Sequence, residues 1–170
     1  MLYSSKKTPI SQIILIITTI IFIIILSIII LFNIRIYKIN GTSMSPTLME
    51  DEYVLSYRTQ YKRGDIIAFH YKDVVMIKRL IGLPKDKIDI DDDGTVYVND
   101  KPLEEQYLSS KSLGKSEIDF PYIVPENRYF VLGDNRADSI DSRNIYLGSI
   151  AETEVIGKVK ISLIPLKLLS

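Results

Sequence analysis

The stretch Gly41-Thr42-Ser43-Met44-Ser45-Pro46-Thr47-Leu48 lies a few residues beyond a membrane-length apolar run. Ser45 followed by Pro46 is typical of a helix N-cap and first helical residue, so about one helical turn is expected. Nucleophilic serines favour sharp turns where backbone N–H groups converge, and Ser43 has a suitable position. An ordinary capping turn has the same hydroxyls, so this stretch alone is a weak indication of chemistry.

The apolar run extends from Ile13 to Phe32 and is interrupted only by hydroxyl residues. As a helix it spans roughly 30 Å, which matches the hydrocarbon core of a bilayer. A cleaved secretory signal is the alternative, but the run exceeds a typical signal core and no small-x-small site follows it. We therefore predict a retained anchor at 13–33 after a tail at 1–12. Lysine or arginine flanks both ends, so charge does not fix the orientation.

Composition excludes several classes of function. The whole chain has 21 basic and 21 acidic residues, and every acidic residue lies at or after Glu50. The part beyond the anchor is therefore mildly acidic, whereas nucleic acid binding usually needs a concentrated basic surface. There is no cysteine and only one histidine, His70, which rules out disulfides and a cysteine nucleophile and argues against a zinc site. We expect no nucleic acid partner, no metal and no cofactor.

Short apolar segments with β-type alternation follow the anchor. Strands are expected at 35–40, 53–57, 66–70, 74–83, 129–132 and 156–164. Residues 87–100 carry aspartates at positions of a calcium-binding EF-hand loop, but apolar residues alternate with period two on both sides of Gly94, which favours a β-hairpin. Residues 104–127 are polar, and we expect a long, mobile excursion over the surface.

Lys78 is the candidate base for Ser43, because a serine hydroxyl is a poor nucleophile until a neighbouring group takes its proton. On a strand, the face of Lys78 is shared with three apolar residues, Val74, Met76 and Leu80. Burial there lowers the pKa of an ammonium group and makes the neutral amine accessible. The ordinary interpretation is that Lys78 only lays its stem over apolar surface. Arg79 points to the other face and is interpreted as structural.

The loop Gly133–Arg143 is a second polar feature, with five charged residues and two hydroxyls directly after an apolar strand. Polar groups at such a place are usually buried and paired. Eleven residues of this composition are more than a connector needs, although a solvated turn remains the alternative.

Together these segments resemble the bacterial type I signal peptidases, Ser–Lys enzymes that remove signal peptides from exported proteins. The motifs occur in order after the apolar run. They are Gly-Thr-Ser-Met-Ser-Pro-Thr-Leu at 41–48, Arg-Gly-Asp-Ile-Ile-Ala-Phe at 63–69, Lys-Arg-Leu-Ile-Gly-Leu-Pro at 78–84 and Gly-Asp-Asn-Arg-Ala-Asp-Ser-Ile-Asp-Ser-Arg at 133–143. The resemblance covers nearly everything after residue 12 except 104–127.

The resemblance implies a role for each motif residue. Ser43 would attack the peptide carbonyl, and Lys78 would act as general base and then general acid. The backbone N–H of Ser43 would form part of the oxyanion hole. Gly41 replaces the serine that Gram-negative members have two positions before the nucleophile, so a second oxyanion donor is not identified. The short chain, single anchor and this glycine resemble Gram-positive members.

The loop residues are also given roles by the resemblance. Ser139 matches the serine that hydrogen-bonds and orients the lysine. Asp141 and Arg143 match a structural ion pair, and Asp134 and Arg136 would support the same loop.

The fold implied is mainly β, with antiparallel sheets, a barrel-like catalytic core and one N-terminal transmembrane helix. The resemblance also implies a cytoplasmic tail and a catalytic domain at 34–170 on the outer face of the cytoplasmic membrane. Substrates would be exported preproteins with small-x-small, typically Ala-x-Ala, cleavage sites, bound as extended strands. The lipid bilayer and the secretion translocon are the further partners expected.

Three alternatives remain open. The first is a Ser–Lys protease dedicated to one substrate or to self-cleavage. The second is a hydrolase that uses His70 as its base. The third is a membrane-tethered β domain that binds exported chains without cutting them.

Overall fold

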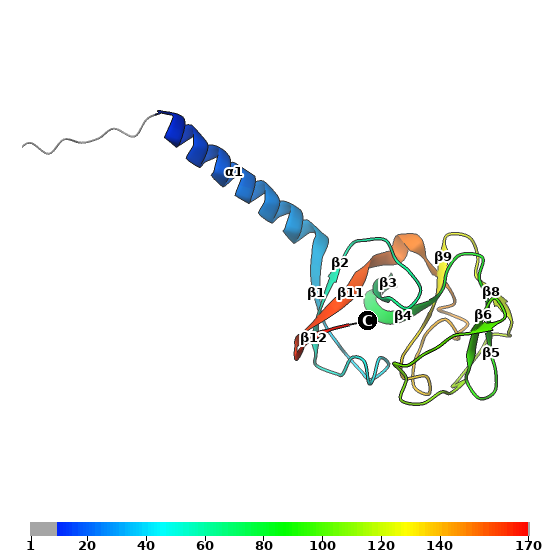
Figure 1. Cartoon of the computed structure of the whole chain (residues 1–170). Coiled ribbons are helices and arrows are strands. Elements are labelled where there is room, and N and C mark those ends of the chain that lie inside the picture. Colours follow the sequence, from blue (N-terminus) through cyan, green and yellow to red (C-terminus); the bar gives the residue numbers. More distant parts are fainter. Residues whose placement is uncertain (1–9, 170) are drawn as a thin grey trace, which may run out of the picture. The chain divides into compact units, whose positions relative to one another are not determined.

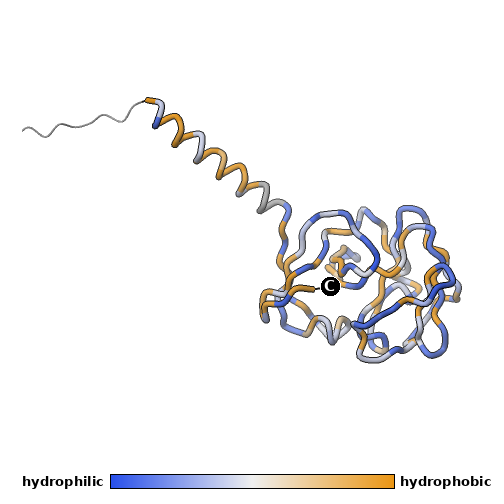
Figure 2. Tube along the Cα trace, in the orientation of Figure 1, coloured by the Kyte–Doolittle hydropathy of each residue, from blue (hydrophilic) through white to orange (hydrophobic). Residues whose placement is uncertain are grey.

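The computed structural model describes residues 10–169, so most of the expected tail at 1–12 lies outside the described residues. The chain divides after Ile34 into a helical unit and a β unit. The helix α1 (Ile10–Asn33) begins at Ile10 rather than at residue 13. Its segment Ile10–Ile28 is long and apolar enough to cross a membrane (Figure 2), and none of it is buried by protein.

Two hydroxyl groups inside α1 are satisfied by the helix itself. The side chains of Thr18 and Thr19 donate hydrogen bonds to the Leu15 carbonyl, at 2.9 and 2.8 Å. A hydroxyl bonded in this way exposes little polarity, so these residues are compatible with a hydrocarbon environment.

The β unit contains a large sheet of eight strands in the order β1-β2-β11-β3-β4-β9-β10, with β12 on β11. The strands are β1 (Ile34–Lys38), β2 (Tyr53–Tyr57), β3 (Ile66–Tyr71), β4 (Val74–Gly82), β9 (Arg128–Leu132), β10 (Ile150–Ala151), β11 (Val155–Ile164) and β12 (Leu166–Leu168), and a 3-10 turn η1 (Glu152–Glu154) precedes β11. The strands predicted from alternation are confirmed, whereas the short β10 and β12 were not predicted. Figure 1 shows this sheet wrapping around the β unit from β1 to β9, with a smaller sheet beyond β9.

The smaller sheet has the order β7-β6-β5-β8, and its strands are β5 (Lys87–Ile90), β6 (Val96–Val98), β7 (Lys101–Pro102) and β8 (Tyr122–Ile123). The predicted hairpin is confirmed, because β5 and β6 pair antiparallel. Asp91 is used by the turn: its carboxylate accepts hydrogen bonds from the Thr95 N–H at 2.8 Å and the Tyr97 hydroxyl at 3.2 Å. The spacing of the aspartates at 87–100 therefore reflects a β-turn rather than an EF-hand loop.

Residues 104–127 differ from the expected surface excursion. They contribute β8, and the side chains of Leu113, Ile118 and Phe120 pack against a buried cluster between the smaller sheet, β4 and β9. Apolar residues at such irregular spacing produce no helix or strand pattern, so their burial was not visible in the sequence.

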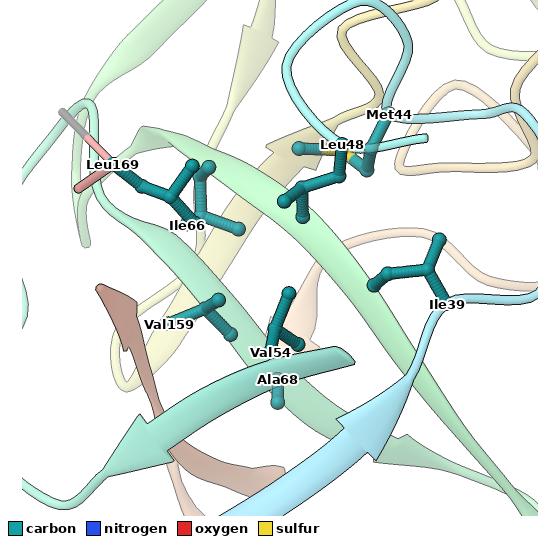
Figure 3. Close-up of a cluster of buried hydrophobic side chains, with 8 residues drawn as sticks. All are labelled: Ile39, Met44, Leu48, Val54, Ile66, Ala68, Val159 and Leu169. Carbon is teal, nitrogen blue, oxygen red and sulfur yellow. The ribbon is translucent and has the colours of Figure 1, made fainter. Parts of the chain in front are cut away.

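A buried cluster under residues 41–48 fixes the stretch that carries Ser43. Met44 and Leu48 are buried, and Figure 3 shows them beside Val54 and Ile66, which come from β2 and β3. The expected helical turn is wrong: the stretch is a series of turns, with a cis Ser45–Pro46 bond and one helix-like hydrogen bond from the Leu48 N–H to the Met44 carbonyl at 2.9 Å. Two apolar anchors hold the backbone here, so no helix is required.

Candidate active site

Ser43 is presented by a turn that follows β1. The turn is closed by a hydrogen bond from the Ser45 N–H to the Thr42 carbonyl at 3.0 Å. Gly41 has φ +86°, in the left-handed region that favours glycine, and its N–H donates to Glu50 at 3.3 Å. The glycine that replaces a serine in the motif therefore serves the backbone of this turn. Within the described residues, the Ser43 N–H has no hydrogen-bond partner.

Lys78 lies on β4 opposite Ile67 of β3, with only 3% of its surface exposed. Its Nζ donates a hydrogen bond to Ser43 Oγ, so the two predicted partners are brought together across 35 residues of sequence. Burial lowers the pKa of Lys78 to about 8; Asp141 and Asp134 oppose this shift, and Arg143 adds to it. A lysine with this pKa is partly neutral near physiological pH and able to accept a proton.

The loop at 133–143 is joined directly to the turn that carries Ser43. The Asn135 N–H donates to the Ser43 carbonyl at 3.0 Å. A side chain on Gly133 would lie 2.5 Å from the same carbonyl and 2.1 Å from Ser139 Oγ. Only glycine allows this close approach, so the loop and the turn form one packed unit.

Asp141 and Arg143 form an ion pair at 2.7 Å, with side chains 0% and 1% exposed. Asp141 also accepts a hydrogen bond from the Gly133 N–H at 2.9 Å. Both Asp141 oxygens accept hydrogen bonds from Arg143, and the Gly133 bond adds a second donor at Oδ2, so the buried pair holds the loop in one conformation.

Asp134 and Arg136 do not pair with each other. Asp134 accepts two hydrogen bonds from Arg79, at 2.8 and 2.7 Å, and one from the Thr47 hydroxyl at 2.5 Å. Arg136 instead forms a buried ion pair with Glu105. Sequence reasoning missed Arg79, Thr47 and Glu105 as partners. An arginine beside a buried lysine was a usable signal, because a buried guanidinium needs a carboxylate.

Ser139 differs from its expected role. Its Oγ is buried and has no hydrogen-bond partner among the described residues, so the expected bond to Lys78 is not made in this structure. The hydroxyl lies against Gly133, at the junction of the loop and the Ser43 turn.

Ser43 and Lys78 open onto a groove of about 400 Å³, between residues 38–44 on one side and Val75–Lys78 on the other. Asp138 and Ile140 complete its lining. His70 is exposed at the end of β3 and is not among the residues that line this groove. No group of acidic or histidine side chains that could hold a metal occurs among residues 10–169.

A serine hydroxyl in contact with a buried amine, at the edge of an open groove in a β domain, is the arrangement that a serine hydrolase with a lysine base requires. Comparison with known proteins gives the same class. The family model described as "Signal peptidase, peptidase S26" matches residues 11–164. The chain belongs to this family.

Named relatives share much of the chain's length. It is 45% identical over 135 residues to "Signal peptidase I" of Bacillus licheniformis, with 71% of this chain and 72% of that protein covered. It is 41% identical over 146 residues to "Signal peptidase I U" of Bacillus subtilis, with 75% and 77% covered. A crystal structure of a signal peptidase I from Enterococcus faecalis is 36% identical, with a TM-score of 0.48 over 59% of this chain and 97% of that one.

Proposed function

We propose that Ser43 and Lys78 are the catalytic pair of a membrane-anchored serine endopeptidase that removes N-terminal signal peptides from exported preproteins. Membership of the signal peptidase family supports the activity. The contact between Lys78 Nζ and Ser43 Oγ supports this assignment of roles, because the amine lies within hydrogen-bond reach of the hydroxyl whose proton it would remove.

In the proposed mechanism, neutral Lys78 accepts the Ser43 proton while Oγ attacks the carbonyl carbon of the scissile bond. The Ser43 N–H donates to the developing oxyanion. The Lys78 ammonium then returns the proton to the leaving amine, the C–N bond breaks, and an acyl-enzyme remains. Water, deprotonated by Lys78, attacks the ester and restores the Ser43 hydroxyl.

We propose that substrates bind the groove as extended strands with small-x-small residues next to the cleaved bond. The groove is open at the surface, and Ile39, Met76 and Ile140 supply apolar lining for small side chains. The tail at 1–12 would lie in the cytoplasm, the anchor would occupy 13–33, and the domain at 34–170 would lie on the outer face of the membrane. Substrates would arrive from the secretion translocon.

The test is cleavage of a purified preprotein by the full chain in detergent. We expect Ser43→Ala and Lys78→Ala each to lower kcat by at least about 10³-fold. His70→Ala is the matched control and should keep parental activity. Cleavage that survives Lys78→Ala, or that is lost in His70→Ala, would contradict the lysine base. A stable complex without product would indicate a binding domain, and cleavage of only one of several preproteins would indicate a dedicated protease.

The pH dependence is a second, independent test of the base. Because burial lowers the pKa of Lys78 to about 8, the neutral fraction rises as pH increases through that value. The acid limb of kcat/KM should therefore have a midpoint close to pH 8. An activity that is constant between about pH 6 and 8, on the acid side of this titration, would exclude Lys78 as the base.

A further inference from the structure

Residues 105–117 contact the loop at 133–143 in two separate places, although nothing in the motifs assigns them a role. The first contact is the ion pair between Glu105 and Arg136, whose side chains are each 1% exposed. Arg136 donates to Glu105 Oε2 at 3.0 Å, and its Nε donates to the Gly133 carbonyl at 3.1 Å. Glu105 is thus connected through one guanidinium to the loop residue that touches the Ser43 turn.

Tyr107 extends the same contact toward β4. Its hydroxyl donates to Glu105 at 2.5 Å, and its ring lies 3.7 Å from the Arg79 guanidinium. Arg79 in turn holds Asp134 through two hydrogen bonds. A cation stacked on an aromatic ring and paired with a carboxylate has little freedom to move. Tyr107 therefore restrains the cation that fixes Asp134.

The second contact is around Arg143. Its Nη1 donates to the Leu113 carbonyl at 2.6 Å, and the Glu117 N–H donates to the Arg143 carbonyl at 2.8 Å. The loop is therefore bonded to residues 105–117 at two positions, Arg136 and Arg143.

We propose that residues 105–117 form a brace for the loop at 133–143, and that Glu105 is a positioning residue that acts on the base Lys78 through Arg136 and Asp134. This proposal rests on the proposed function, because it takes Lys78 to be the base. Glu105 itself does not line the groove, so its effect on the reaction is transmitted through the loop.

The charges around Lys78 explain how the effect is transmitted. Among the described residues, Asp134, Asp141 and Arg143 of the loop act on Lys78, and Asp138 of the loop and Lys38 also line its groove. On β3, the residue opposite Lys78 is the apolar Ile67. Without the Glu105 carboxylate, Arg136 becomes an unpaired buried cation, and Asp134 is the nearby acidic group that also acts on it. Once Asp134 is shared with Arg136, it attracts the Lys78 ammonium less.

The experiment compares Glu105→Gln with Glu104→Gln in the full chain, using a preprotein substrate in detergent. Glu104 is exposed and adjacent in sequence, so it is the matched control for loss of one carboxylate. For Glu105→Gln we expect kcat to fall about 10-fold with KM within about twofold, because the groove is intact. Its acid limb should move to lower pH by roughly half a unit, since less negative charge stabilises the ammonium. Glu104→Gln should match the parent in kcat, in KM and in the midpoint of the acid limb.

Several outcomes would overturn the brace. The first is a folded Glu105→Gln variant whose kcat and acid limb equal those of the parent. The second is a loss of activity that appears mainly as a higher KM, with no shift of the acid limb. If Glu105→Gln does not fold, Tyr107→Phe decides: it keeps the ring on Arg79 but removes the hydroxyl from Glu105. We expect its kcat to fall roughly threefold, because Glu105 loses one hydrogen bond but keeps its ion pair with Arg136, and an unchanged kcat would contradict the brace.

Failure of the proposed function would be seen separately, as absence of cleavage by the parent itself. Amide hydrogen exchange would then still test the brace, because it needs no activity. The loop amides of Gly133, Asn135 and Ser142 should exchange faster in Glu105→Gln than in Glu104→Gln. Equal exchange in the two variants would show that Glu105 does not hold the loop.

Discussion

Burial of Lys78 changes both its chemistry and its contribution to folding. The pKa of the amine is about 10.5 when exposed and about 8 in the folded domain. Between these values the unfolded chain binds the proton that the folded chain has released, so the free energy of unfolding increases with pH. Below pH 8 both states are protonated, and the folded state carries the full penalty of a buried ammonium. The residue proposed as base therefore destabilises the domain at neutral pH.

We predict that Lys78→Met stabilises the protein. A pKa shift of this size corresponds to a stabilisation of roughly 3 kcal/mol, which is present in full below pH 8 and is lost progressively as pH rises toward 10.5. Urea unfolding of the full chain in detergent, followed by tyrosine fluorescence, would measure it. Lys101→Met, at an exposed strand position, is the control and should change stability by less than about 0.5 kcal/mol. A Lys78→Met variant less stable than the parent would show that the amine is satisfied where it lies.

Single residues were predictable from the sequence where a motif or a strand face marked them. Ser43 and Lys78 were singled out in this way, and their contact was expected before it was seen. Arg79 was assigned to the opposite strand face, but its burial was not expected, because alternation does not say whether both faces of a central strand are covered. The unpartnered Oγ of Ser139 depends on loop backbone positions, which no pattern in the sequence specifies.

At the scale of elements, the geometry of the proposed catalytic pair depends on the packing of two irregular segments rather than on the sheet alone. Met44 and Leu48 anchor the Ser43 turn in a core cluster with Leu169 from the end of the chain. Gly133 brings the following loop against that turn. Because both segments are fixed by side chains far apart in sequence, a small displacement in either is transmitted to Ser43.

We predict that Gly133→Ala lowers activity far more than its loss of folding stability can account for. Its new methyl group would lie 2.5 Å from the Ser43 carbonyl and 2.1 Å from Ser139 Oγ, so the nucleophile turn has to shift. A displacement of about 1 Å at a reacting atom lowers kcat by about 10²-fold.

Gly148→Ala is the control for that substitution, because Gly148 has φ +57° but open space around its Cβ position. It should lose about 1 kcal/mol of stability from backbone strain and keep its kcat. Equal kcat values for the two variants, measured on a preprotein, would show that the contact at Gly133 does not position Ser43.

The strands of the large sheet were predictable because their apolar residues alternate. The hairpin at 87–98 was distinguished from an EF-hand for the same reason. Residues 104–127 were not predictable, since their fixed points are long-range polar contacts such as Arg136 to Glu105, separated by 31 positions. No periodicity connects such residues, and a buried ion pair consists of the same residue types as an exposed one, so the sequence does not distinguish them.

At the scale of the whole molecule, the helix and the β unit follow each other without a linker, because α1 ends at Asn33 and β1 begins at Ile34. With α1 in a bilayer, the domain is confined to a thin layer next to the membrane. A preprotein still held by its apolar signal segment would occupy the same layer. Confinement of both partners raises the effective concentration of the cleavage site without any additional contact.

We predict that removal of α1 affects membrane-bound substrates selectively. A chain beginning at Asn33 keeps β1 and the three buried clusters of the β unit, so it should cleave a short soluble peptide within about threefold of the full chain. Against a preprotein in vesicles, its rate should fall by at least about 10²-fold, because the effective-concentration term is lost. A chain with an unrelated apolar helix of equal length in place of α1 should recover that rate. Equal losses on peptide and preprotein would mean that α1 is needed for the fold of the domain, and no loss on either would mean that confinement to the membrane does not contribute to cleavage.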